Sequence, residues 1–341
     1  MKKYGTIHDA LFISMGGIGN CILLTPAIRA FEGIAPSARL HFLVPKNGSR
    51  QVVERHPRIG SIFEIDLSIG GLLPLIRQLR RIRPEIVMVA NGTNPLKSGL
   101  IGLLGGGRIR LGESFGAGRV LYNRTVPYNP ALHECTANLR MIDALSPIDT
   151  TPDPMVWTTE EDRSAAERFI VKHRLDCRWV GLHLGSGPAM AYKRWPTDRF
   201  IEVARQCIER YNCKIVVFGG PDEIALSNRA VVQIGENAVS AVGKLTLRQS
   251  YEVMKDAALF ISNDSGPMHL AAVAGIPVIA IFGPTMDHKT SPLGGRTEVI
   301  TAPVECRPCY NYKPITCSSF ECLDRITVDQ ILTAVRKILV T

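Results

Sequence analysis

The residues best suited to chemistry lie where an apolar run gives way to a helix of small residues. Residues 259–262 predict a buried strand, and the helix expected over 267–274 follows a polar turn that holds Asp264 and Ser265. Backbone N–H groups at the start of a helix have no partner within it and bind anions, and Gly266 has no side chain to keep a phosphate away. The segment therefore predicts a diphosphate site.

Two side chains in this segment have alternative interpretations. Asp264 either caps the helix or faces a ligand at the carboxyl end of the strand, and we favour the ligand. His269 lies within apolar sequence, so it is either a structural histidine or a member of the site.

A second loop, residues 183–196, follows another expected strand. Ser186 and the neighbouring Gly187 give a turn with exposed backbone amides, and Lys193 supplies a mobile positive charge. Such a charge stabilises a diphosphate most strongly as it departs. The alternative is a surface Lys-Arg pair beside a packed tryptophan.

A third loop follows the strand expected over 214–218. Gly219 and Gly220 form a turn, and Glu223 follows three residues after Gly220. An acid just past a strand end accepts hydrogen bonds from ribose hydroxyls, although it can instead contribute only charge to a helix start. Three such loops on strands of one domain are stronger evidence together than any one of them alone.

The N-terminal loop, residues 16–20, joins an expected strand to a helix. It matches a dinucleotide-binding fingerprint only in part, because Gly17 and Gly19 are followed by Asn20 and no third glycine. The second expected strand also lacks the acid that would bind a ribose, so a dehydrogenase is disfavoured.

Short apolar runs of strand length alternate with helical patterns along both halves of the chain. This alternation requires crossover connections and predicts parallel sheets, hence a doubly wound α/β fold. A proline-rich stretch at 146–157 indicates a linker. We expect an N-terminal domain at 1–150, a donor domain at 158–325 and a C-terminal helix within 326–341 that packs back on the N-terminal domain.

Composition limits the classes of function. The 341 residues are enough for two cores, and the formal net charge of +9 favours polyanionic partners. An arginine run at Arg77, Arg80, Arg81 and Arg83 is either a solvated helix face or a patch that faces a membrane or acceptor. It lacks the interleaved aromatic residues of a base-stacking surface, so we expect no nucleic-acid partner.

No signal peptide or apolar stretch of spanning length is evident, because glycines interrupt the first apolar run. We therefore expect a cytoplasmic protein with reduced thiols among its nine cysteines. Four late cysteines, Cys306, Cys309, Cys317 and Cys322, form two close pairs that suit a tetrahedral structural metal such as zinc. Free thiols or a redox-sensitive disulfide are the alternatives.

These loops, in this order, resemble glycosyltransferase family 9, the bacterial heptosyltransferases that build the inner core of lipopolysaccharide. The resemblance runs through residues 16–20 and 25–30, the Lys-Arg-Trp-Pro segment at 193–196, and the blocks at 264–272 and 282–285. It covers nearly the whole chain.

The resemblance implies a GT-B fold, with two Rossmann-like domains facing across a cleft, and an inverting transfer from a nucleotide-diphosphate sugar, ADP-heptose in the best-known members. It implies that Lys193 and the amides from Ser265 onward hold the diphosphate, that Glu223 holds the ribose and that Asp264 serves the donor region. No metal is implied for the chemistry. The residues thereby expected to bind the donor are Gly19, Ser186, Gly187, Lys193, Glu223, Asp264, Ser265, Gly266, Met268 and His269.

The chain departs from the family pattern at position 20. The family usually has an aspartate there, taken as the base that deprotonates the acceptor hydroxyl, and this chain has Asn20. An amide does not accept a proton as a carboxylate does. We therefore expect catalysis to involve Asn20, Lys193 and Asp264, with Asn20 orienting the acceptor and His8, Asp9 or another group as the base.

The function expected is transfer of a sugar onto a glycolipid or glycan acceptor such as the lipopolysaccharide core, with heptose from ADP-heptose as the favoured donor. We also expect peripheral contact with an anionic membrane on its cytoplasmic side. One alternative is a transferase that uses another nucleotide sugar for a different surface glycan. A second is a catalytically degenerate sugar-nucleotide-binding protein. A third, a zinc-dependent nucleic-acid module, lacks a basic recognition helix near the cysteines.

Overall fold

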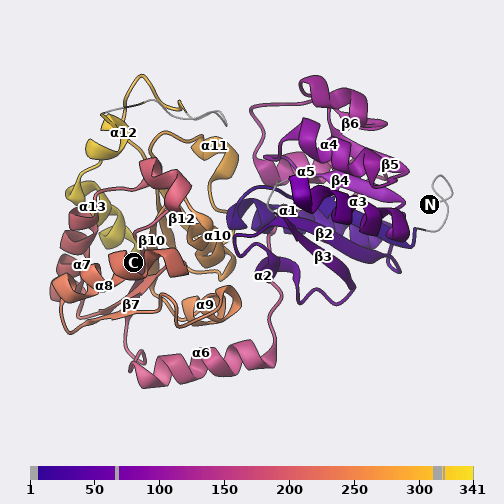
Figure 1. Ribbon diagram of the computed structural model, residues 1–341. Helices are drawn as coiled ribbons and strands as arrows, with labels where there is room; N and C mark the ends of the chain where they lie inside the picture. Colours follow the sequence, from indigo (N-terminus) through magenta and orange to yellow (C-terminus); the bar gives the residue numbers. More distant parts are fainter. Residues whose placement is uncertain (1–6, 66–68, 310–316, 318, 341) are drawn as a thin grey trace. The chain divides into compact units, whose positions relative to one another are not determined.

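The computed structural model describes residues 7–65, 69–309, 317 and 319–340 (Figure 1). The chain divides into two compact units, residues 1–157 and 158–341. Each unit contains a six-stranded sheet in which every paired strand is parallel to its neighbours. This confirms the doubly wound α/β fold predicted from the alternating pattern.

The sheet of the first unit has the strand order β3-β2-β1-β4-β5-β6. Its strands are β1 (Asp9–Ile13), β2 (Arg39–Pro45), β3 (Ile59–Ile65), β4 (Ile86–Val89), β5 (Ile109–Glu113) and β6 (Arg124–Val126). The helices are α1 (Ile18–Ile34), α2 (Arg50–Val53), α3 (Ile69–Ile82), α4 (Pro95–Leu104), the 3₁₀ helix η1 (Ala117–Leu121) and α5 (Glu134–Asp143).

The central strands β1 and β4 determine where the glycine-rich loop lies. All five residues of β1 are buried, as a strand covered on both faces requires. Ile13 at the end of β1 pairs with Val89 at the end of β4. The loops that follow the two strands therefore emerge side by side, and the amide of Met15 donates a 3.1 Å hydrogen bond to the hydroxyl of Thr93 across them.

The sheet of the second unit has the order β12-β11-β10-β7-β8-β9. Its strands are β7 (Trp179–His183), β8 (Lys214–Phe218), β9 (Ala238–Ser240), β10 (Leu259–Asn263), β11 (Val278–Ile281) and β12 (Thr297–Ile300). Its helices are α6 (Glu160–Lys172), η2 (Pro188–Lys193), α7 (Thr197–Tyr211), η3 (Pro221–Glu223), α8 (Ile224–Ile234), α9 (Leu247–Met254), α10 (Gly266–Val273), α11 (Asp287–Thr290), α12 (Glu321–Asp324) and α13 (Val328–Leu339).

Strand register brings the three predicted loops together in this unit. His183 pairs with Ser262 of β10 on one side and with Phe218 of β8 on the other. The carboxyl ends of β7, β8 and β10 thus lie in one row, where ligands bind in open parallel sheets.

That the C-terminal helix packs back on the N-terminal domain stays a prediction. Within the second unit, α13 contributes Ile331, Leu332, Ala334 and Val335 to the core. Its strongly amphipathic sequence buries this apolar stripe there, beside α7 and the strands β10 to β12. Among the residues that the structure describes, no helix combines the length and the apolar character needed to cross a bilayer.

Candidate active site

The Lys193 ammonium and the Asp264 carboxylate meet at the carboxyl end of β10. Lys193 Nζ lies 2.8 Å from Asp264 Oδ2, and the aspartate is buried while the lysine side chain keeps 17% exposure. The structure therefore brings together two residues that the sequence assigned to the same site from different loops. A lysine paired in this way can exchange the carboxylate for another anion that enters the site.

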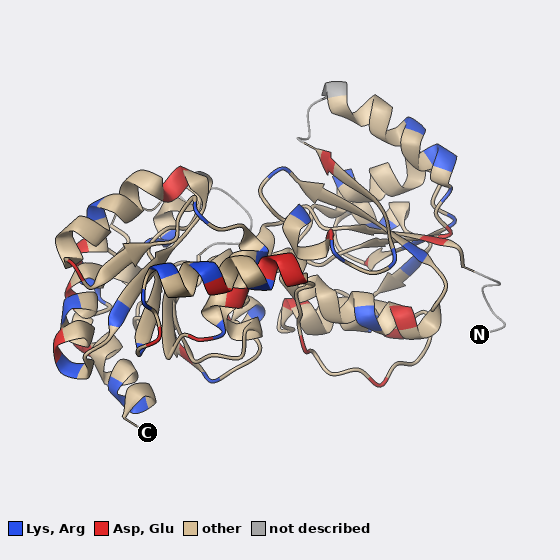
Figure 2. Cartoon of the chain, turned by 90° about the horizontal axis from the view of Figure 1, so that it is seen from below, with Lys and Arg blue, Asp and Glu red and all other residues tan. Residues whose placement is uncertain are grey.

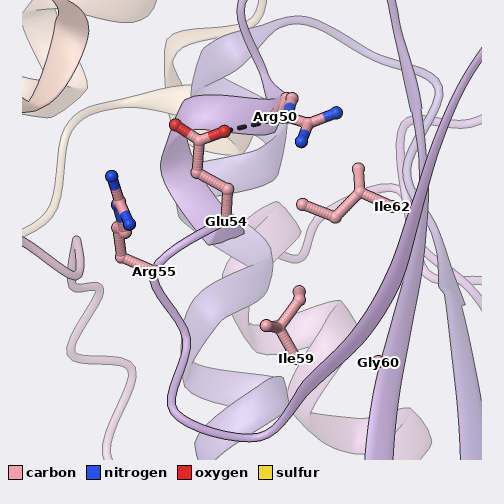
Figure 3. Close-up of a pocket in the computed structure, with 6 residues that line it drawn as sticks. All are labelled: Arg50, Glu54, Arg55, Ile59, Gly60 and Ile62. Carbon is pink, nitrogen blue, oxygen red and sulfur yellow. Dashed lines mark hydrogen bonds and ion pairs between the residues drawn. The ribbon is translucent and has the colours of Figure 1, made fainter.

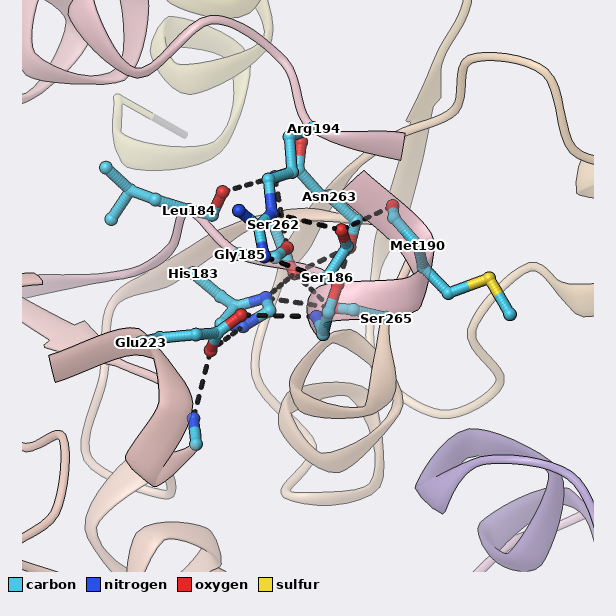
Figure 4. Close-up of polar contacts among 12 residues, drawn as sticks. His183, Leu184, Gly185, Ser186, Met190, Arg194, Glu223, Ser262, Asn263 and Ser265 are labelled. Carbon is cyan, nitrogen blue, oxygen red and sulfur yellow. Dashed lines mark hydrogen bonds and ion pairs between the residues drawn. The ribbon is translucent and has the colours of Figure 1, made fainter. Parts of the chain in front are cut away.

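Asn263 fixes the lysine loop against β10, and sequence reasoning missed it. Its Oδ1 accepts a 2.9 Å hydrogen bond from the amide of Trp195, and its Nδ2 donates to the carbonyl oxygens of Leu184 and Gly185 at 2.8 and 3.2 Å. The side chain is fully buried, so these bonds hold both ends of the loop (Figure 4). Only its position at the carboxyl end of a strand could have indicated this role.

Ser265 stands at the N-cap of α10 but does not cap the helix with its side chain. Its hydroxyl instead contacts His183 Nδ1 at 2.8 Å and donates to the carbonyl oxygen of Asn263 at 3.1 Å (Figure 4). The N-terminus of α10 is thus left without a side-chain cap, as a site for an anion requires. Gly266 is the first residue of the helix.

Glu223 lies beneath the same loops and is almost completely buried. Its carboxylate accepts hydrogen bonds from His183 Nε2 at 3.0 Å, from the amide of Gly220 at 2.9 Å and from the amide of Gly187 at 3.3 Å. Burial alone raises the pKa of Glu223, but the His183 hydrogen bond and charge, with the two amides, outweigh it and lower the pKa to about 2. Ser265, His183 and Glu223 therefore form a continuous hydrogen-bonded chain across β10, β7 and β8.

Two glycines make room for this carboxylate. A Cβ atom at Gly185 would overlap Oε1 of Glu223, and one at Gly219 would lie about 2.5 Å from Oε2. Ser186, in the same loop, donates a 2.6 Å hydrogen bond to the Met190 carbonyl oxygen. The glycines of these loops thus serve the packing of Glu223 as well as turn geometry.

Two other predicted residues, Met268 and His269, have buried side chains on α10, with 0% and 4% exposure. A role for either residue in donor binding stays a prediction.

Asn20 lies in the first unit, near the start of α1. Its Oδ1 accepts a 2.9 Å hydrogen bond from the amide of Gly17, and its Nδ2 donates to Glu134 Oε2 at 2.6 Å. Gly19 beside it is buried. Gly16 and Gly92 allow this packing, because a Cβ atom at either position would come within 2.7 Å of the Asn20 side chain.

The two bases considered for Asn20 lie at the opposite end of β1. His8 precedes the strand and Asp9 begins it, whereas Asn20 follows the strand's carboxyl end. Asp9 is also buried against Arg39 Nε at 2.9 Å and His41 Nε2 at 2.8 Å. The structure therefore excludes both residues as neighbours of Asn20.

The four late cysteines differ in their exposure to solvent. Cys306 and Cys309 are exposed, Cys317 is half-buried and Cys322 is buried. Within the described part of the chain, no three or more His, Cys, Asp or Glu side chains are arranged to hold a metal ion. Residues 310–316 and 318, which connect the two cysteine pairs, lie outside that part.

A cavity of about 350 Å³ lies elsewhere, between α2 and β3 of the first unit (Figure 3). It contains no predicted site residue. Arg50 at its edge is paired with Glu54 at 2.8 Å and with Glu64 at 3.3 Å, so its charge is already balanced.

The sequence profile of glycosyltransferase family 9, the heptosyltransferases, matches residues 72–317. The chain belongs to glycosyltransferase family 9. This confirms the family inferred from the motifs.

Several family 9 relatives align over most of the chain. A lipooligosaccharide heptosyltransferase 2 of Haemophilus influenzae is 30% identical, over 86% of this chain and 88% of its own. The lipopolysaccharide heptosyltransferase 2 of Escherichia coli is 24% identical, over 85% and 87%. The chain spans only about half the length of two Campylobacter jejuni lipooligosaccharide heptosyltransferases 2 that it matches at 29% identity.

Solved structures of the family share the fold. A family 9 glycosyltransferase from Veillonella parvula superposes with a TM-score of 0.81 at 24% identity, over 98% of this chain and 97% of that one. The ADP-heptose heptosyltransferase II of Escherichia coli gives 0.75 at 22% identity, over 97% and 98%. The family 9 chain thus has the GT-B architecture of two Rossmann-like units.

Proposed function

We propose that this protein transfers a heptose from ADP-heptose onto a lipopolysaccharide-core or related glycan acceptor with inversion at the sugar. The observation that carries the proposal is the Lys193–Asp264 pair at the uncapped start of α10, in a chain that belongs to family 9. The relatives named above are heptosyltransferases of lipopolysaccharide and lipooligosaccharide.

The chemistry of the proposed donor site is electrostatic. As the bond between sugar and diphosphate breaks, negative charge grows on the leaving diphosphate, and a lysine and helix amides placed beside it lower the barrier. Lys193 moves from Asp264 to the diphosphate, and the amides from Ser265 onward bind it. Because the lysine and the helix terminus neutralise this charge, the step requires no metal.

Glu223 has a double role in this proposal. Its carboxylate already accepts three hydrogen bonds, which position the loops that carry Ser186 and Gly187. A carboxylate has about four acceptor positions. We assign the remaining one to a ribose hydroxyl of the donor.

One alternative is favoured by a specific observation, the amide at position 20. If the site has no base, the protein binds a sugar nucleotide without turnover.

Another nucleotide sugar, for a different surface glycan, is the alternative within the enzyme class. The rise in melting temperature with ADP, UDP or GDP shows which nucleotide the donor site prefers, since a ligand stabilises the state that binds it. Equal stabilisation by all three would contradict the choice of ADP-heptose.

We also propose peripheral attachment to the cytoplasmic face of an anionic membrane. The supporting feature is α4, which places its small residues against the sheet and its leucines outward. Four leucines with 41–50% exposure follow helical spacing: Leu96, Leu100, Leu103 and Leu104. The guanidinium of Arg80 on the neighbouring α3 donates to the carbonyl oxygen of Leu104 at 2.8 Å, and Figure 2 shows the basic residues of this unit in blue. Exposed leucines beside arginines suit a bilayer with anionic head groups.

Vesicle sedimentation tests this attachment. We expect the protein to bind vesicles of phosphatidylglycerol and phosphatidylcholine at low salt and a Leu100→Ser, Leu104→Ser variant to bind at least ~5-fold more weakly. The matched control is Val232→Ser, an exposed apolar residue of α8 in the other unit. Equal binding by all three proteins would refute the surface, and self-association of the wild type lost in the leucine variant would assign it to a second copy instead.

A structural metal at Cys306, Cys309, Cys317 and Cys322 stays a prediction. Elemental analysis of the purified protein tests it. About one zinc per chain, lost in a Cys306→Ser, Cys309→Ser variant, would support the site, and a wild type without metal would refute it.

A further inference from the structure

A buried glutamate contacts the side chain of Asn20. Glu134 is the first residue of α5 and is 1% exposed, and its Oε2 lies 2.6 Å from Asn20 Nδ2. The two residues are separated by 114 positions in the sequence. They meet because α5 packs beside α1 in the first unit (Figure 1).

Two loops are shaped to hold this pair. Gly16 lies over Asn20, the amide of Gly17 donates to its Oδ1, and Gly92 after β4 leaves room for both side chains. A Cβ atom at Gly92 would lie 2.9 Å from Glu134 Oε1. Both polar ends of the Asn20 amide are therefore oriented, with Nδ2 toward the carboxylate. Glu134 also lies at the start of a helix, where the helix dipole stabilises its negative charge.

Transfer to a hydroxyl requires a group that receives the hydroxyl proton. Asn20 is the partly exposed member of the pair and Glu134 the buried one. We propose that Asn20 and Glu134 together form the proton-accepting site of this enzyme, with Asn20 contacting the acceptor and Glu134 acting through it. The proposal rests on the proposed glycosyl transfer and supplies the base that position 20 lacks.

Proton transfer accompanies the transfer of the sugar. The acceptor oxygen forms a bond to the anomeric carbon, and the bond from that carbon to the diphosphate breaks, with its electron pair leaving on the diphosphate. The hydroxyl proton passes to Asn20 Oδ1, which keeps one acceptor position beside its bond to the Gly17 amide. A proton passes at the same time from Asn20 Nδ2 to Glu134 Oε2. Asn20 becomes a neutral imidic acid and Glu134 becomes protonated. After product release Glu134 returns its proton to Asn20 Nδ2, and Asn20 Oδ1 releases the proton taken from the acceptor to water, which restores both side chains.

Exchanging the amide at position 20 and the carboxylate at position 134 tests the proposal. Glu134→Gln keeps a side-chain oxygen that accepts from Asn20 but removes the proton acceptor. We expect kcat to fall at least ~100-fold while the Kd for ADP-heptose changes less than ~2-fold. The double variant Asn20→Asp, Glu134→Gln places the carboxylate one side chain nearer the acceptor, and we expect it to recover at least ~10-fold in kcat over Glu134→Gln.

The single variant Asn20→Asp provides a readout that a structural role would not give. It puts two carboxylates in contact, which raises the pKa of the pair, so its pH–kcat profile should rise at higher pH than that of the double variant. The matched control is Glu113→Gln, because Glu113 Oε2 accepts a 2.6 Å bond from Asn91 Nδ2 in the same unit. We expect its kcat to stay within ~3-fold of the wild type.

The outcomes separate two claims. If the wild type transfers the sugar and Glu134→Gln is equally active, the proton transfer through Asn20 to Glu134 is wrong, and the proposed function still stands. A double variant that binds ADP-heptose but is no better than Glu134→Gln also overturns the relay. A wild type that transfers no sugar from any nucleotide donor overturns the proposed function and the relay with it.

Discussion

Replacement of Glu223 by glutamine should destabilise the second unit in a way that depends on pH. The carboxylate is buried and accepts hydrogen bonds from His183, Gly220 and Gly187. Glutamine has nearly the same shape but no charge, so it keeps the packing and loses the charge-assisted part of these bonds. The variant thus isolates the contribution of the ionised group.

The magnitude follows from the pKa of Glu223. Burial raises this pKa, yet His183 and the two amides lower it from 4.5 to about 2 in the folded protein. A depressed pKa stabilises the folded state above the unfolded-state pKa, and that stabilisation is lost as pH falls toward the folded-state pKa. At 1.36 kcal/mol per unit, ionised Glu223 contributes about 3 kcal/mol at pH 7 and about 2 kcal/mol at pH 3.5.

Urea unfolding followed by tryptophan fluorescence measures this contribution. Trp179 and Trp195 are buried in the second unit, and Trp157 belongs to the first, so a Trp157→Phe background makes the signal specific. We expect Glu223→Gln to lower the free energy of unfolding by about 3 kcal/mol at pH 7 and by less as pH falls below 4.5. The exposed Asp222→Asn serves as the matched control.

Two results would refute this reasoning. A Glu223→Gln effect that stays constant between pH 7 and pH 3.5 would show that the ionised carboxylate is not the source of stability. A similar loss in Asp222→Asn would show that any charge removed from this helix start has the same effect.

Three further predictions concern the same unit. Lys193→Ala should lower kcat/KM for ADP-heptose at least ~100-fold in steady-state assays, because its ammonium stabilises the departing diphosphate. Gly185→Ala should displace the Glu223 carboxylate and cost about 3 kcal/mol in urea unfolding, with little further loss when combined with Glu223→Gln. Arg248→Met should cost about 3 kcal/mol in the same measurement, because it leaves Asp162 buried without the guanidinium that lies 3.0 Å away.

Strands and helices with a regular pattern of apolar residues could be predicted from the sequence. The strand at 214–218 has the predicted bounds in the structure. Other elements lacked the signal. The five-residue β5 contains charged residues, the three-residue β6 is mostly exposed, and α4 turns its leucines outward, so none of them shows the usual burial pattern.

The candidate site was predicted only where its chemistry is local. Lys193 and Asp264 were found because each lies in a loop with glycines or a helix start. His183 and Glu134 were not assigned roles, because their importance comes from partners distant in sequence. His183 reaches Ser265, 82 residues away, and Glu134 reaches Asn20. Hydrogen bonds of this kind, between side chains far apart in the sequence, can be recognised only when the strand order is known. Hydrophobic periodicity alone does not give that order.

Product formation is the measurement that tests the account most directly. The purified protein is incubated with ADP-heptose and a heptose-deficient lipopolysaccharide core, and the products are analysed by mass spectrometry, with Lys193→Ala alongside. We predict that the wild type adds one heptose to the acceptor and releases ADP, and that the variant forms at least ~100-fold less product per unit time. An acceptor left unchanged by the wild type while the protein binds ADP-heptose would contradict the proposed transfer.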